Sequence, residues 1–262
     1  MSAPRPCACA LAEKDAPTRS GQDTCAIVVA GGVGQRFGDP RGKQYVELCG
    51  LPIACWAVLA LDRAPSVGHV VVVCAPERED EMRRDVLGRL RLRCPVTIAH
   101  SGATRQESVY SGLCAVPGRS GFSMVAIHDA ARPLVRTQDV ERCIARVRGD
   151  DAVAGAICAV PSTDTLKLVE GDSVVATPDR SFYWCAQTPQ VFRTKAIVSA
   201  HRAAIWDEFV GTDDASLVER HGGRVACVKS SRDNIKVTLP EDLAIAQTLL
   251  ERRLIQEGCG LE

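Results

Sequence analysis

A glycine-rich segment, Cys25-Ala-Ile-Val-Val-Ala-Gly-Gly-Val-Gly-Gln-Arg-Phe-Gly38, is followed by Lys43-Gln-Tyr45. Its apolar start predicts a short strand, and its glycines allow the backbone to take a positive φ and approach a ligand closely. Backbone N–H groups in such a loop can point at phosphate oxygens. Arg36 and Lys43 add full positive charge beside them. The segment therefore predicts a strand that ends in a phosphate-binding loop.

Short β-branched runs alternate with segments of helical periodicity along the rest of the chain. This alternation is typical of a mostly parallel sheet covered by helices on both faces, an α/β/α arrangement of three layers. We expect strands at 25–30, 67–75, 96–99, 124–128, 153–160 and 225–229, and helices at 51–61, 105–116, 140–147, 194–204 and from 240 onward. Residues 163–187 break the alternation, because two β-like arms flank Glu170-Gly-Asp172. This pattern predicts a protruding β-hairpin arm.

Length and composition favour one catalytic domain. The chain has 262 residues, of which 46% are apolar, enough for a single large core. We expect a disordered tail over 1–24, the domain over 25–253 with the arm at about 163–187, and a second tail over 254–262. Lys plus Arg and Asp plus Glu both number 32, so the chain lacks the overall positive charge of a non-specific nucleic-acid binder.

The thirteen cysteines are odd in number and scattered, with no C-x-x-C pair. We interpret nearly all of them as small buried hydrophobes in a reducing compartment. The apolar stretch from Cys7 to Ala12 is too short for a signal peptide, and no segment has the roughly 20 apolar residues of a membrane span. We therefore expect a cytoplasmic protein without a membrane partner.

Two common phosphate-binding loops do not fit the first segment. A dinucleotide-binding turn needs G-x-G-x-x-G and an acid after the second strand, whereas Gly32-Val-Gly34-Gln-Arg-Phe-Gly38 is one residue longer and the second strand ends in Cys74-Ala-Pro. A Walker A loop needs G-x-x-x-x-G-K-[ST], but Gly38-Asp-Pro-Arg-Gly-Lys-Gln has one residue too few before its lysine. A plain strand–helix turn remains the alternative.

Two further segments place charged residues after predicted strands, where ligands bind in open α/β sheets. In Ile127-His-Asp-Ala-Ala-Arg-Pro133, Asp129 can bind magnesium or a substrate hydroxyl, and Arg132 an anion. The alternative is an Asp–Arg pair that braces the loop. In the segment from Arg232 to Asp242, Lys236 can contact a phosphoryl group and Asp233 a metal, and the alternative is a surface loop.

The charged groups together favour one class of chemistry. No Ser-His-Asp order, no H-E-x-x-H and no metal-type Cys/His cluster is evident in the sequence. Several cations instead converge on strand ends with one or two aspartates, and Arg105 and Ser108 begin a predicted helix there. This set suits nucleotidyl transfer by positioning and charge neutralisation.

Seven segments occur in an order that resembles the 2-C-methyl-D-erythritol 4-phosphate cytidylyltransferase family over about residues 25–253. They are Ala-Gly-Gly-x-Gly-x-Arg with Lys-Gln-Tyr, Gly-x-x-Arg-x-x-Ser-Val, His-Asp-Ala-Ala-Arg-Pro, Asp-Thr-Leu-Lys, Gln-Thr-Pro-Gln-x-Phe, Thr-Asp-Asp-Ala-Ser and Asp-Asn-Ile-Lys-Val-Thr. The resemblance implies a Rossmann-like homodimeric enzyme that uses magnesium (Mg²⁺), CTP and a sugar-alcohol phosphate.

The resemblance also implies roles for individual residues. Those that would bind the nucleotide are Ala30, Gly31, Gly32, Gly34, Arg105, Ser108, Asp129 and Ala130. The catalytic cations would be Arg36, Lys43 and Lys236. Contacts to the second substrate would come from Asp129, Arg132, Thr165, Arg180, Thr188, Thr212 and Lys236, and Asp129 and Asp233 are the candidate metal ligands. Arg180, on the arm, would reach into the site of the partner subunit.

Two other functions stay open. A ribitol 5-phosphate cytidylyltransferase shares the fold, the nucleotide and most of the cations, although His-Asp-Ala-Ala-Arg-Pro and Arg-Asp-Asn-Ile-Lys look more like the methylerythritol enzymes. A non-catalytic nucleotide-binding regulator is expected to have lost Lys43 or Lys236, and both are present.

Overall fold

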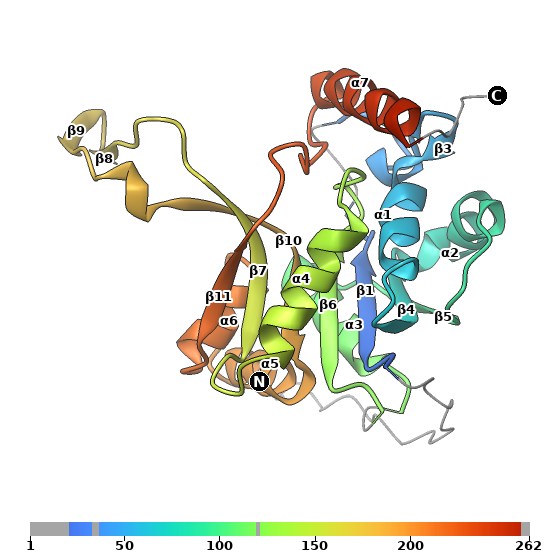
Figure 1. Cartoon of the computed structure of the whole chain (residues 1–262), viewed down its shortest axis with the longest axis horizontal. Coiled ribbons are helices and arrows are strands. Elements are labelled where there is room, and N and C mark those ends of the chain that lie inside the picture. Colours follow the sequence, from blue (N-terminus) through green and yellow to red (C-terminus); the bar gives the residue numbers. More distant parts are fainter. Residues whose placement is uncertain (1–20, 33–36, 119–120, 258–262) are drawn as a thin grey trace, which may run out of the picture.

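The computed structural model describes residues 21–32, 37–118 and 121–257. A seven-stranded sheet in the order β11-β7-β10-β6-β1-β4-β5 forms its centre (Figure 1). All strands are parallel except β10, which runs antiparallel to both of its neighbours. The strands are β1 (Thr24–Val29), β4 (Val67–Cys74), β5 (Val96–His100), β6 (Met124–Asp129), β7 (Gly155–Pro161), β10 (Trp184–Arg193) and β11 (Val225–Lys229).

Helices cover both faces of this sheet, which confirms the predicted three layers. The helices of the described ranges are α1 (Ile53–Asp62), α2 (Glu79–Glu81), α3 (Arg105–Cys114), α4 (Thr137–Arg148), α5 (Thr194–Trp206), α6 (Asp214–Arg220) and α7 (Pro240–Gln256). Shorter pieces are the pair β2 (Glu47–Leu48) and β3 (Leu51–Pro52), and the single turns η1 (Lys43–Tyr45), η2 (Pro76–Arg78), η3 (Met82–Val86), η4 (Leu87–Arg89) and η5 (Arg180–Phe182). None of the helices within the described ranges is long and apolar enough to cross a membrane.

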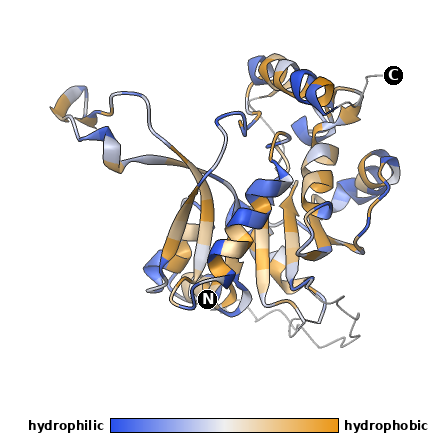
Figure 2. Cartoon of the chain, viewed as in Figure 1, coloured by the Kyte–Doolittle hydropathy of each residue, from blue (hydrophilic) through white to orange (hydrophobic). Residues whose placement is uncertain are grey.

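Strand β1 shows why the sheet is covered on both sides. Its side chains alternate between the two faces, as a strand requires. Ala26 and Val28 belong to one buried cluster with α1 and α4, whereas Cys25 and Ile27 belong to a second cluster with α3, α5 and α6. Figure 2 shows the hydrophobic strands at the centre and a hydrophilic outward side on α4. A strand buried on both faces is therefore a continuous apolar run, which made β1 easy to predict.

Helix α7 lies beyond the end of the sheet and fixes the loop before it. A third buried cluster joins Ala246 and Leu250 of α7 to Val237 in that loop. The backbone N–H of Val237 donates to the carbonyl of Ala131, 2.8 Å away. The loop that carries Lys236 is thereby tied to the loop that follows β6.

Strand β10 was not among the predicted strands. The sequence Gln187-Thr-Pro-Gln190 contains a proline, and proline argues against a central strand because it cannot donate to the ladder. The structure accommodates it with a bulge, since Ala186 pairs with Ala159 but Gln190 pairs with Ile157. The Thr188–Pro189 peptide bond is cis. The bulge places Thr188 beside the end of β6.

The protruding arm is present, with different limits from those predicted. Strands β8 (Leu168–Glu170) and β9 (Ser173–Ala176) form its antiparallel hairpin, and Gly171 at the turn has φ of 61°. The prediction that the arm extends to residue 187 is wrong, because Trp184 already pairs with Pro161 in the main sheet. The arm is therefore a continuation of β7 and β10 away from the body (Figure 1).

The cysteines are less uniformly buried than predicted. Ten lie within the described ranges, and none of these is in a disulfide. Six are buried, two are half-buried and two are exposed. The exposed pair is Cys185 on β10 and Cys227 on the edge strand β11. Cys227 lies on an edge strand, and Cys185 pairs with Val160 near the base of the arm.

Candidate active site

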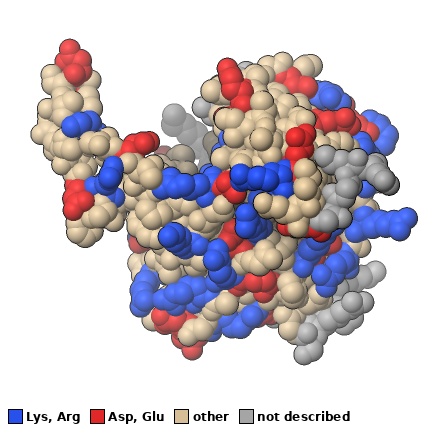
Figure 3. Space-filling model, turned by 45° about the horizontal axis from the view of Figure 1, so that its top comes forward, with Lys and Arg blue, Asp and Glu red and all other residues tan. Residues whose placement is uncertain are grey.

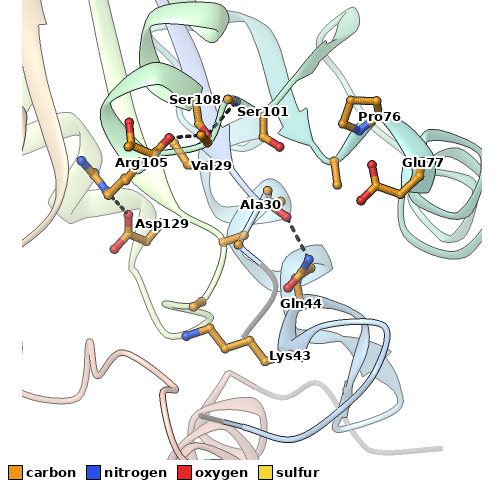
Figure 4. Close-up of a pocket in the computed structure, with 18 of the residues that line it drawn as sticks. Val29, Ala30, Lys43, Gln44, Pro76, Glu77, Ser101, Arg105, Ser108 and Asp129 are labelled. Atoms are coloured by element: carbon orange, nitrogen blue, oxygen red, sulfur yellow. Dashed lines mark hydrogen bonds and ion pairs between the residues drawn. The ribbon is translucent and has the colours of Figure 1, made fainter. Parts of the chain in front are cut away.

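A pocket of about 510 Å³ opens at the carboxyl ends of four neighbouring parallel strands, β1, β6, β4 and β5. Its lining comes from the loops after these strands, from the first turn of α3, from η1 and from Lys236. Figure 4 shows Lys43 and Gln44 on one side of the pocket and Arg105 and Ser108 on the other. This edge of an open α/β sheet is where ligands bind.

The glycine loop is held against two neighbouring segments. The N–H of Ala30 donates to the carbonyl of Val73 at 2.7 Å, and Gln44 Nε2 donates to the carbonyl of Ala30 at 2.9 Å. A Cβ on Gly31 would lie 2.2 Å from that of Ser101, so a side chain there would clash. Close approach of the chain therefore explains Gly31. Gly34 and Arg36, also predicted for this site, lie outside the described residues.

The first turn of α3 forms the opposite wall. Thr104 is the N-cap, and its Oγ1 accepts from the N–H of Glu107. Ser108 Oγ donates to the carbonyl of Thr104 at 2.8 Å and accepts from the N–H of Gly102 at 3.2 Å. These bonds order the turn. Arg105 and Ser108, which were both predicted for this site, line the pocket.

Asp129, the last residue of β6, forms ion pairs with two positively charged side chains. Its Oδ1 accepts from Arg105 Nε at 3.1 Å, and its Oδ2 accepts from Lys236 Nζ at 2.7 Å. Burial of this carboxyl group would raise its pKa, but the charges of Arg105 and Lys236 outweigh burial and hold the pKa well below its ordinary value. Asp129 is therefore ionised at neutral pH and fixed in place.

His128 and Thr188 support Asp129 from behind. The N–H of Asp129 donates to Thr188 Oγ1 at 3.1 Å, and Thr188 Oγ1 lies 2.9 Å from His128 Nδ1. His128 Nε2 lies 3.1 Å from the carbonyl of Arg132, which can only accept, so Nε2 carries the proton and Nδ1 accepts from the Thr188 hydroxyl. Burial lowers the pKa of His128 to about 4, which keeps the ring neutral. The hydroxyl proton of Thr188 thus points into the protein.

Arg132 is not among the residues that line the pocket. Its NH1 donates to the carbonyl of Asn234 at 2.7 Å, and burial lowers its pKa. Asn234 is itself fully buried and donates to Gln187 and to the carbonyl of Thr188. Arg132 therefore links the loop after β6 to the loop that carries Lys236.

The remaining predicted residues lie away from this pocket. Thr165 and Arg180 are exposed on the arm, where Arg180 NH1 donates to the carbonyl of Thr163. Thr212 is exposed just before α6. Asp233 pairs with Arg136 at 3.5 Å and Arg252 at 3.9 Å and is not among the pocket-lining residues.

Sequence reasoning missed several supporting residues. Gln44 anchors the glycine loop, and Asp214 binds Arg105 NH1 at 2.8 Å from the first position of α6. Asp214 belongs to the Thr-Asp-Asp-Ala-Ser segment that contributes to the family resemblance. Nothing in the sequence relates it to Arg105, because the two residues lie 109 positions apart.

The donor set fits a magnesium ion that is held largely by a nucleotide. Within the described ranges, no three His, Cys, Asp or Glu side chains come together as a metal site. Asp129 and Glu77 are the carboxylates that line the pocket. Mg²⁺ in nucleotide sites is usually bound by one or two carboxylates together with phosphate oxygens and water. Asp129 has room for this role, since a carboxylate offers about four lone-pair positions.

The charge on Asp129 predicts a pH-dependent stability difference. Because its pKa is depressed in the folded protein, its contribution is present above the ordinary value of about 4 and is lost as pH falls through the folded value. We expect Asp129→Asn to lower the free energy of unfolding by about 1–3 kcal/mol at pH 7. This difference should shrink at pH 3.5, as measured by urea unfolding at several pH values.

Asp172→Asn, at the exposed tip of the arm, is the matched control. It should change the free energy of unfolding by less than about 0.5 kcal/mol at each pH. A difference for Asp129→Asn that is the same at pH 7 and pH 3.5 would show that its charge does not stabilise the fold.

Comparison with known proteins places this geometry in a family. The model of the family described as IspD, 2-C-methyl-D-erythritol 4-phosphate cytidylyltransferase, matches residues 24–252. Relatives of that name from Syntrophotalea carbinolica and Geobacter metallireducens are 42% and 39% identical, over 86% and 87% of this chain and 95% and 98% of theirs.

Solved structures agree. The 4-diphosphocytidyl-2C-methyl-D-erythritol synthase from Anaerococcus prevotii superposes with a TM-score of 0.77 at 26% identity, covering 88% of this chain and 97% of that one. The 2-C-methyl-D-erythritol 4-phosphate cytidylyltransferase from Francisella tularensis has a TM-score of 0.72 at 28% identity, covering 86% and 99%. The chain, with its glycine loop and its paired cations on Asp129, belongs to the 2-C-methyl-D-erythritol 4-phosphate cytidylyltransferase family.

Proposed function

We propose that this chain transfers CMP from CTP to 2-C-methyl-D-erythritol 4-phosphate. The products are pyrophosphate and 4-diphosphocytidyl-2-C-methyl-D-erythritol, and the reaction belongs to the non-mevalonate route to isoprenoid precursors. The observation that carries the proposal is the fixed Arg105–Asp129–Lys236 arrangement beside a glycine loop, in a chain that belongs to this family.

The reaction needs positioning more than covalent chemistry. A phosphate oxygen of the acceptor attacks the α-phosphorus of CTP, a new O–P bond forms, and the bond to the β-phosphate oxygen breaks as pyrophosphate leaves. The attacking oxygen is already anionic, so no general base is required. Negative charge on the transferring and leaving groups must be stabilised, which fixed cations do well in a site that excludes water.

The residues of the pocket divide this work. Ala30, Gly31 and Gly32 line the pocket, and the N–H groups of the two glycines would cradle the triphosphate, because that of Ala30 already donates to Val73. Arg105 and Ser108 would hold the nucleoside from α3. Lys43, from η1, stabilises charge on the α-phosphate and the leaving pyrophosphate, together with Arg36. Lys236, now held by Asp129, can turn to the acceptor phosphate because its side chain is 41% exposed.

Magnesium would bind with CTP. Asp129 would hold the ion from the protein side, and the phosphate oxygens would supply most other ligands. The ion would supply further charge neutralisation at the triphosphate. Asp233 is a weaker candidate, because its two arginine partners compete for its carboxylate.

The arm supports a homodimer in which each subunit completes its partner's site. Seven large apolar residues at the arm and its base are exposed, namely Leu168, Val169, Val174, Val175, Phe182, Tyr183 and Trp184. An apolar surface of this kind marks a contact with another protein. Arg180 and Thr165 lie on the same arm, outside the pocket of their own chain. Figure 3 shows Lys and Arg side chains on the face between the arm and the body.

We also assign the enzyme to the cytoplasm. None of the ten cysteines in the described ranges is in a disulfide, a state that a reducing compartment preserves.

The substrate assignment is tested with the purified protein. We expect pyrophosphate release with CTP, magnesium and 2-C-methyl-D-erythritol 4-phosphate, and little or none when ribitol 5-phosphate replaces the acceptor. Release with ribitol 5-phosphate alone would transfer the chain to the other cytidylyltransferase class. No release with either acceptor, together with CTP binding, would favour the non-catalytic regulator.

Lys43→Ala should lower kcat by about 10²–10³-fold while leaving the protein folded. The reason is that one preorganised charge is removed from the transition state. Lys195→Ala, an exposed lysine on α5, is the matched control and should stay within about twofold of the wild type. Steady-state rates and thermal unfolding measure both effects, and near wild-type turnover in Lys43→Ala would remove Lys43 from the mechanism.

Mixing two inactive variants tests whether the arm acts across the interface. In a heterodimer of Lys43→Ala and Arg180→Ala, one site has its own Lys43 and receives an intact Arg180 from the partner subunit. Random mixing makes half of the dimers mixed, so activity should recover to about one quarter of the wild type. If the mixture stays at the level of the parents, Arg180 does not act in trans.

A further inference from the structure

We propose that Asp214 is a positioning residue that fixes the guanidinium of Arg105 for nucleotide binding. This inference rests on the proposed function, and it concerns a residue that does not line the pocket. Asp214 Oδ2 accepts from Arg105 NH1 at 2.8 Å, while Asp129 accepts from Arg105 Nε at 3.1 Å. The guanidinium is thus held by two carboxylates, one inside the pocket and one behind it.

Arg105 is oriented by its hydrogen bonds to two different carboxylates. A planar guanidinium can engage a single carboxylate through two parallel hydrogen bonds. If Arg105 turned fully onto Asp129 in this way, it would leave the nucleotide side of the pocket and compete with Lys236 for the same carboxylate. The bond from NH1 to Asp214 prevents this rotation, because it anchors one end of the guanidinium to α6.

Asp214 is itself rigidly supported. It is 1% exposed, and its Oδ1 lies 3.2 Å from Nε2 of His201, which is fully buried on α5. A carboxylate can only accept, so His201 carries its proton on Nε2, and its Nδ1 has no hydrogen-bond partner within the described ranges. The ring of His201 is stacked on Tyr110, with centroids 6.1 Å apart.

The burial of Asp214 also explains why it can act only through Arg105. Burial would raise the pKa of this carboxyl group, but the charge of Arg105 holds the pKa below its ordinary value. A buried carboxylate is retained at such a position only with a strong partner. Arg105 is that partner, and it is the connection from α6 to the pocket.

A double-mutant cycle tests the inference. Asp214→Asn keeps the shape of the side chain but removes its charge, and we expect the Kd for CTP and the KM for CTP to rise about tenfold with kcat changed less than threefold. In an Arg105→Ala background the same substitution should change the Kd by less than about twofold, because the residue through which it acts is gone. Calorimetric titration with CTP measures all four proteins without requiring turnover.

His201→Phe provides an independent route to the same result. It keeps a ring of similar size against Tyr110 and removes the donor to Asp214, so it should also raise the Kd for CTP only when Arg105 is present. This variant decides the question if Asp214→Asn does not fold, as judged by thermal unfolding.

Asp213→Asn is the matched control, on the neighbouring carboxylate. Asp213 caps α6 by accepting from the N–H of Ser216, and asparagine caps equally well. This control should bind CTP like the wild type. Equal effects of Asp214→Asn with and without Arg105, or no effect in either background, would overturn the inference. A wild-type protein that binds CTP but does not release pyrophosphate would instead refute the proposed function.

Discussion

The organisation of the pocket depends on one shared carboxylate. Asp129 stands at the end of the central strand β6, and its two oxygens hold Arg105 and Lys236, which arrive from segments on either side of it in the sequence. Each cation would repel the other without the carboxylate between them. Because both are fixed by the same group, the pocket presents positive charge at defined points before any ligand arrives, which is the preorganisation that phosphoryl transfer requires.

Much of the fold could be predicted from the sequence because its strands are strongly patterned. Strand β1 is buried on both faces and is apolar from Cys25 to Val29, and the loop after it has an unusual density of glycine. Strand β10 was missed because Pro189 interrupts it, and a proline in a central strand is tolerated only through a bulge that no local pattern announces. Tertiary structure here overrides a sound local rule.

Some residues of the site could likewise be predicted from the sequence, and others could not. Residues at a strand end or in the loop after it, such as Asp129 and Lys236, were identified because parallel strands deliver their ends to one edge. Supporting residues such as Asp214 and Gln44 were not identified, because their partners are distant in the sequence or are backbone atoms. The prediction for Arg180 depends on a second subunit, and Thr165 and Thr212 are not among the residues that line the pocket.

The way in which the arm leaves the sheet has a consequence for how this protein can vary. Trp184 pairs with Pro161, so both legs of the arm grow directly from β10 and β7, and the same strand β10 carries the bulge that puts Thr188 behind Asp129. Insertions at the turn around Gly171 would lengthen the arm without moving the pocket. An insertion or deletion between residues 184 and 190 would shift both together. Natural length variation should therefore accumulate at the tip of the arm and be rare at its root.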